Sequence, residues 1–105
     1  MAVATSNTVT VSSSTSSDWV KLAPGVNRLL ISCASWSTSS AALEYSDDAT
    51  TAYVVKLGTN DAVVAESANM AIDIDGITGY ARINVSTYGS SPVTLKVLNP
   101  VDNRL

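Results

Sequence analysis

The chain has 105 residues, a length that suits one domain with a single core. Apolar residues make up 46% of it, charged residues only 14%, and the formal net charge is −3. Arg28, Lys56, Arg82 and Lys96 are scattered singly, so the composition excludes the clustered basic surface of a protein that binds nucleic acid. No segment reaches the roughly 20 apolar residues of a membrane helix, and the first residues do not resemble a signal peptide.

Residue types that common catalytic devices need are missing from the chain. It has no His, which excludes Ser-His-Asp and Cys-His arrangements. Cys33 is the single cysteine, so no disulfide can form within the chain, and we expect this residue to be a small buried hydrophobe. We therefore expect no enzymatic activity, no cofactor and no metal site.

Residues 1–17 are rich in Ser and Thr. Val9 and Val11 alternate there with hydroxyl side chains, which predicts a flexible N-terminal segment that contains one strand. Residues 18–105 should form the folded domain. Its first elements are a short edge segment at Trp19 and Leu22 and a turn at Pro24-Gly25.

A strong strand is predicted over residues 26–34, where the run Leu29-Leu30-Ile31 indicates burial on both faces or a bulge. Later segments alternate apolar and polar residues over short lengths and are separated by turn residues. They predict strands at 41–46, 52–58, 61–67, 70–75, 80–86 and 92–99. About eight short strands with close turns indicate an all-β fold, a single antiparallel β-sandwich or jelly-roll-like domain.

The stretch "MAIDIDGITGYARINV", residues 70–85, predicts a hairpin with a four-residue loop at 76–79. In that register Asp73 lies opposite Arg82 as an exposed ion pair, and Ile72 lies opposite Ile83. A calcium loop is disfavoured because no third oxygen ligand and no closing Glu follow. A catalytic carboxylate pair is disfavoured because both aspartates share one exposed strand face.

The aromatic residues raise the alternative of a sugar-binding surface, since exposed Trp and Tyr can stack on sugars. Trp19, Trp36 and Tyr53 lie beside apolar strand residues, so we expect them to be core or subunit-contact anchors. Tyr88, in "STYGSS", is the best candidate for an exposed aromatic platform.

Most of the chain resembles small β-sandwich virion proteins of tailed bacteriophages. The resemblance rests on an L-x-Y strand, a G-x-x-x-G-Y-A-R stretch and a final T-L-x-V strand, here residues 43–45, 76–82 and 94–97. It implies a head decoration or cement protein that contacts the major capsid protein and itself, with a trimer favoured. It also implies synthesis in the host cytoplasm and a final location on the capsid surface. The alternative is a tail- or fibre-associated carbohydrate-binding or adhesin module.

Both ends of the chain are the predicted contact regions, because termini without a packed partner can order on binding. An open sandwich with few charges on its edge strands also gains by burying those edges in a symmetric contact. The predicted capsid or subunit contacts are Asn7, Thr8, Val9, Val11, Val101, Arg104 and Leu105.

Overall fold

The computed structural model describes residues 3–57, 61–66, 68–75 and 79–99, and over these ranges the chain forms β-strands joined by turns and loops. The strands are β1 (Thr8–Val11), β2 (Val20–Leu22), β3 (Val26–Cys33), β4 (Ser40–Ser46), β5 (Tyr53–Val54), β6 (Lys56–Leu57), β7 (Asp61–Ala62), β8 (Val64–Ala65), β9 (Met70–Asp75), β10 (Gly79–Thr87) and β11 (Val93–Leu98). The predicted all-β class is confirmed.

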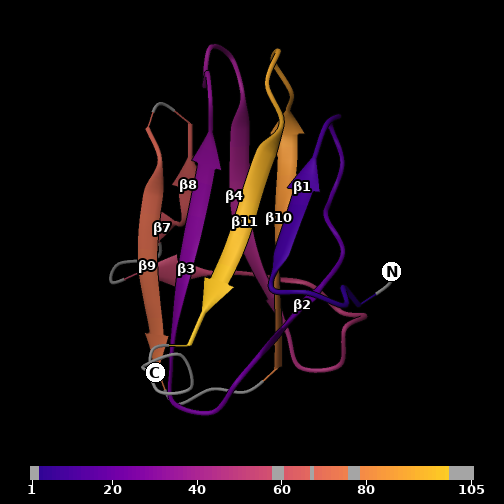
Figure 1. The fold of residues 1–105 in the computed structure, drawn as a ribbon, viewed down its shortest axis with the longest axis vertical. Coiled ribbons are helices and arrows are strands. Elements are labelled where there is room, and N and C mark those ends of the chain that lie inside the picture. The colour runs from indigo at the N-terminus through magenta and orange to yellow at the C-terminus, as the bar shows by residue number, and fades with distance from the viewer. Residues whose placement is uncertain (1–2, 58–60, 67, 76–78, 100–105) are drawn as a thin grey trace.

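Two antiparallel sheets pack face to face (Figure 1). The first has the order β1-β11-β3-β9, and the second has the order β2-β10-β4, with β5 and β8 both on the free side of β4. Early and late strands of the chain therefore lie next to each other in both sheets, which is the jelly-roll arrangement. The N-terminal strand that the sequence predicts is the edge of the first sheet, where it pairs with β11 from Thr8↔Lys96 to Val11↔Val93.

The core lies between the sheets, because every second side chain of each long strand points inward. In β3 the inward residues Leu29 and Ile31 are fully buried, while Leu30 between them is half-buried on the outer face. The β3–β11 register runs without interruption, so of the two predicted alternatives for this run the bulge is wrong. Cys33 is buried, as expected. Other core residues are Val20, Leu22, Ala41, Leu43, Ala81, Ile83, Val85, Val93, Leu95 and Val97.

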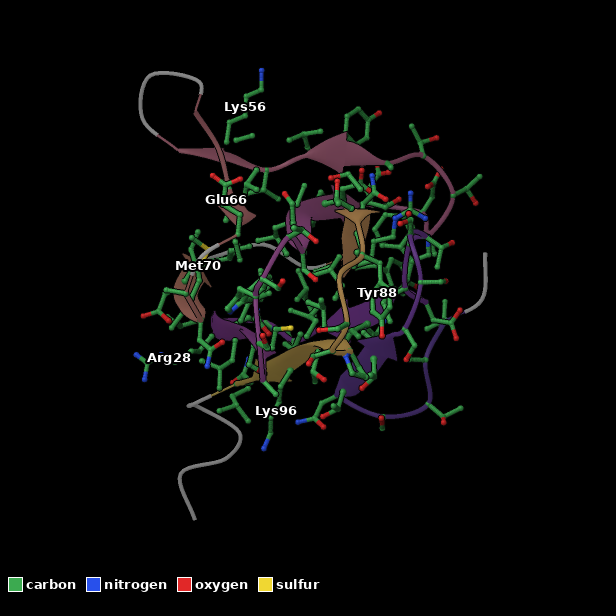
Figure 2. The ribbon with its side chains drawn as sticks, turned by 90° about the horizontal axis from the view of Figure 1, so that it is seen from above. Arg28, Lys56, Glu66, Met70, Tyr88 and Lys96 are labelled. Carbon is green, nitrogen blue, oxygen red and sulfur yellow. The ribbon has the colours of Figure 1, made fainter. Side chains whose placement is uncertain are left out.

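The predicted strands 52–58 and 61–67 form a bent hairpin instead of two uninterrupted strands. Tyr53 and Val54 pair with β4, and Val64 and Ala65 pair with β4 further along. Between these contacts the Leu43 carbonyl accepts a bond from the Val55 N–H, and the Leu43 N–H donates to Val63. Among the described strands, β6 and β7 pair with each other alone, and they project from the edge of the second sheet (Figure 2, near Lys56).

The predicted hairpin of residues 70–85 is wrong. β9 pairs with β3 in the first sheet, whereas β10 pairs with β2 and β4 in the second. Asp73 consequently lies opposite Arg28, and Arg82 lies opposite Glu44. The alternating apolar residues of β10 are buried, and those of β9 are partly buried and pack against the same core from its other side. The alternation of a single strand cannot reveal which sheet the strand joins.

Gly79, the first residue of β10, is required by the backbone. Its φ is +140°, a backbone conformation that residues other than glycine rarely adopt. A Cβ there would lie 2.7 Å from the Ser46 carbonyl oxygen and 2.5 Å from the Tyr45 hydroxyl. This glycine therefore allows the close approach of β10 to β4.

Candidate functional site

The edge strand β1 brings together all of the predicted N-terminal contact residues. Thr8 and Thr10 are exposed on the outer face, Val9 is half-buried and Val11 is buried against the core. Asn7 precedes the strand, where its side-chain amide donates to the Val97 carbonyl over 3.0 Å. The other predicted contacts, Val101, Arg104 and Leu105, lie outside the described residues.

The edge formed by β1 has no charge to protect it. Residues 1–17 contain no Asp, Glu, Lys, Arg or Pro, and the first charged residue of the chain is Asp18. Natural proteins commonly blunt an open edge with Lys, Pro or a bulge, because unpaired backbone groups on an edge recruit further strands. β1 is short, with four residues, but it carries none of these residue types.

The backbone groups of β1 divide between its two sides. The Asn7 carbonyl accepts from the Val97 N–H over 2.8 Å, which fixes the side that faces β11. In an antiparallel pair alternate residues face the same neighbour, so Val9 and Val11 also bond toward β11, while Thr8 and Thr10 present their N–H and C=O groups to the free side. The Ser6 hydroxyl confirms this assignment, because it donates to the Thr8 carbonyl and accepts from the Thr8 N–H.

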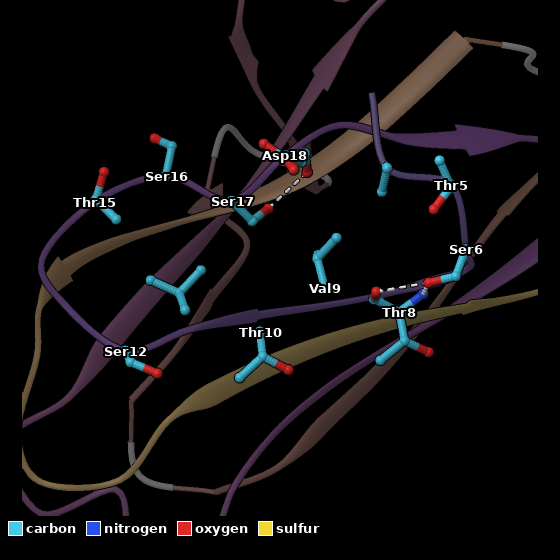
Figure 3. A pocket seen from close by; sticks show the side chains of 12 residues that line it. Thr5, Ser6, Thr8, Val9, Thr10, Ser12, Thr15, Ser16, Ser17 and Asp18 are labelled. Atoms are coloured by element: carbon cyan, nitrogen blue, oxygen red, sulfur yellow. Dashed lines mark hydrogen bonds between the residues drawn. The ribbon is translucent and has the colours of Figure 1, made fainter. Parts of the chain in front are cut away.

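An open pocket of about 450 Å³ lies beside β1, between the edges of the two sheets (Figure 3). We call it the window. Residues 4–6 and 12–15 cross from one sheet toward the other and close two of its sides, and residues 15–18 form the side opposite β1. Val9 points into it, and the other lining side chains are mostly hydroxyls.

Residues 15–17 form the far side of the window by pairing with β10. The Val85 N–H donates to the Thr15 carbonyl, and the Ser17 N–H donates to the Ile83 carbonyl, each over 2.9 Å. The Ser17 hydroxyl in turn accepts from the Ile83 N–H. The window therefore has a hydrogen-bonded frame that neither sheet provides alone.

The side chains that line the window are mostly hydroxyls, which suit the binding of a polar partner. Among its lining residues only Asp18 is charged, and hydroxyls without an adjacent base are weak nucleophiles. Across the described residues no group of three or more His, Cys, Asp or Glu side chains could hold a metal ion. Hydroxyl and backbone groups of this kind can accept a strand or a polar ligand.

A second cluster, on the outer face of the second sheet, was not anticipated from the sequence. Arg82 donates to Glu44 over 2.7 Å, and both side chains are largely buried. The Arg82 guanidinium lies 4.3 Å from the Trp19 ring centroid, a cation–π contact. Trp19 is fully buried, yet its Nε1 has no hydrogen-bond partner among the described residues. Strand alternation could have predicted the outward position of Trp19. Val20 and Leu22 point inward, so Trp19 and Lys21 must point outward.

The pKa values of two aspartates, Asp73 and Asp48, are lowered by hydrogen bonds within the fold. The hydrogen bond from Arg28, 2.8 Å from the Asp73 carboxylate, lowers the pKa of Asp73, and the Arg28 charge lowers it further. Backbone N–H groups of Thr51 and Thr50 and the Ser46 hydroxyl lower the pKa of Asp48 in the turn after β4. Neither carboxylate lies in a cleft with a second catalytic group, so neither points to catalysis.

The aromatic residues are distributed differently from the prediction. Trp36 is buried in the core, as expected, and its Nε1 donates to Asn69. Tyr53 does not belong to the core, because it is 56% exposed on β5. Tyr88 is only half-exposed and packs against the core, so Tyr53 is the better platform (Figure 2 labels Tyr88).

Comparisons with models of protein families, with curated proteins and with solved structures find no match. No helix long and apolar enough to cross a membrane occurs in the ranges that the structure describes.

Proposed function

We propose that the chain is a structural protein of a tailed-phage virion, a decoration or cement protein that stabilises the head by binding the major capsid protein and itself. The observation that carries the proposal is the edge of β1, which is uncharged and open and lies beside a hydroxyl-lined window. A monomer that works alone gains nothing from such an edge, whereas an assembling protein can pair it with another chain.

Three further features support this role. The sequence resembles virion proteins of this kind, and jelly rolls are common in viral capsid domains. The chain has no His, and Asp73 and Glu44 are engaged in ion pairs with arginines. Its low share of charged residues, 14%, leaves strand surfaces rich in Ser, Thr, Ala and Val, which suit flat contacts between subunits.

A carbohydrate-binding or adhesin module is the second candidate. Tyr53 and Val54 are 56% and 47% exposed on the edge strand β5, and jelly rolls also include lectin domains. An exposed tyrosine ring can stack on a sugar, and the hydroxyls of the window can bond to one. The position of the gene beside capsid genes or beside fibre genes separates the two candidates.

The direct experiment is co-sedimentation of the purified chain with phage heads assembled without it. We expect saturable binding to assembled heads and weaker binding to free capsid subunits, because a decoration site is completed only where subunits meet. Retention on immobilised glycans that Tyr53→Ala abolishes, without binding to heads, would reject the decoration role in favour of the adhesin. Tyr88→Ala is the matched control, since Tyr88 packs against the core.

A further inference from the structure

We infer that the β1 edge is a self-association site, at which two copies of the chain pair β1 with β1 antiparallel about a two-fold axis at Thr10. The inference deepens the proposed function, because it names the surface through which a structural protein would assemble. It predicts a dimer, whereas the resemblance to virion proteins favours a trimer.

The free backbone groups locate the axis. Thr10 is exposed, and its N–H and C=O groups face away from β11. Thr8 faces the same way, but the Ser6 hydroxyl already contacts both its N–H and its C=O, at 3.3 and 3.0 Å. Thr10 is therefore the residue of β1 that can exchange two hydrogen bonds with a partner without displacing an existing one.

The side chains agree with this register. With Thr10 opposite the partner's Thr10, Val9 lies opposite the partner's Val11 on the inner face, and Thr8 lies opposite Ser12 on the outer face. The half-buried Val9 gains an apolar neighbour. A register shifted to centre on Val9 would place the exposed Asn7 opposite the buried Val11, which is less favourable.

The charge distribution permits two identical edges to meet. A two-fold contact at Thr10 places that residue opposite its own copy and brings the same short segment of both chains together, so a Lys or Asp at the axis would meet a like charge. Residues 1–17 carry no charge, whereas the opposite edge of the same sheet, β9, carries Asp73 in an ion pair with Arg28. The neutral edge is therefore the one suited to an identical partner.

The test uses charge exchange at Thr10 in the full chain. Thr10→Lys and Thr10→Asp should each weaken dimerisation at least about tenfold, measured by sedimentation equilibrium, because like charges meet at the axis. An equimolar mixture of the two variants should restore the dimer, now with one copy of each. Ala71→Lys and Ala71→Asp are the controls, since Ala71 is exposed on the outer face of β9, and they should leave dimerisation unchanged. Circular dichroism verifies that each variant keeps the fold.

Three results would overturn the inference: a wild-type chain that stays monomeric up to its solubility limit, a Thr10→Lys dimer as strong as wild type, or a trimer that Ala71→Lys disrupts. The last would indicate a ring in which β1 meets β9 of the next copy. Binding to phage heads is measured separately. A dimer that ignores heads would reject the proposed function and leave the β1 contact standing.

Discussion

Two cross-strand ion pairs on the outer faces of the two sheets have the same chemistry and opposite surroundings. Arg28 and Asp73 form a bidentate pair with bonds of 2.8 and 3.1 Å, but their side chains are 50% and 48% exposed. Arg82 and Glu44 share one bond of 2.7 Å, and their side chains are only 14% and 11% exposed. The exposed pair has the better hydrogen-bond geometry, yet the covered pair should matter more, because a charge left alone there cannot return to water.

Trp19 makes the difference between the two pairs. Its ring lies against Arg82, and the N-terminal chain runs alongside it, where the Ala4 N–H donates to the Trp19 carbonyl over 2.7 Å. Among the described residues, the strands of the first sheet contain no aromatic side chain that could cover Arg28. An indole on the outer face therefore turns a surface ion pair into a buried one.

The largest expected effect comes from removing that cover. Trp19→Ala should lower the free energy of unfolding by about 3–5 kcal/mol, because it leaves a large cavity and exposes the Arg82–Glu44 pair. Trp19→Phe is the control and should cost much less, since it keeps most of the ring and removes the unpaired Nε1–H. Urea denaturation measures both. Equal costs for Ala and Phe would contradict the role of the ring as a cover over the ion pair.

Breaking the covered pair should have the next largest effect. Arg82→Ala should cost about 3 kcal/mol, because it leaves the Glu44 carboxylate buried without its cation. The double replacement Arg82→Met with Glu44→Leu should cost less than Arg82→Ala, since it removes both charges and keeps apolar volume. A double-mutant cycle with Arg82→Met and Glu44→Leu, made singly and together, measures the coupling. If the costs of the two single replacements simply add up in the double variant, the two side chains are not coupled.

The exposed pair should give the smallest effect, which depends on pH and salt. Asp73→Asn should lower the melting temperature slightly at neutral pH and low salt. The folded-state pKa of Asp73 is lowered, so its contribution is present above the ordinary aspartate pKa of about 4 and disappears as the pH falls through the lowered value. Wild type and variant should therefore converge in acid and in high salt. A difference that persists there would mean that Asp73 has a structural role beyond its charge.

The two edges of the first sheet also differ in charge, and this difference bears on assembly. The edge at β9 carries an ion pair, and the edge at β1 is neutral. Charge on β9 adds little to stability, but it disfavours pairing with an identical strand, which is how charged edges prevent aggregation. The neutral edge lacks that protection, so it is the place where a second chain can bind.

The sequence by itself determined the strands and their buried faces. Alternation predicted the strong strand at 26–34 and the strands at 41–46, 70–75, 80–86 and 92–99, and the structure places strands at all of them. This success has a local cause, because successive side chains of a strand point to opposite faces wherever the strand lies. The burial of Cys33, the last residue of β3, follows from the same alternation, whereas Trp36 lies in the connection after β3 and is buried by packing.

Only the tertiary structure decided which strands are neighbours. Asp73 and Arg82 are close in sequence but belong to different sheets, because a jelly roll passes most of its connections across the core instead of along one sheet. Any outward carboxylate can pair with any outward cation, so sequence offers no preference between Arg82 and Arg28 as the partner of Asp73. The Trp19 cluster and the window likewise depend on the packing of segments far apart in the chain, and long-range packing leaves no trace in the periodicity of a single strand.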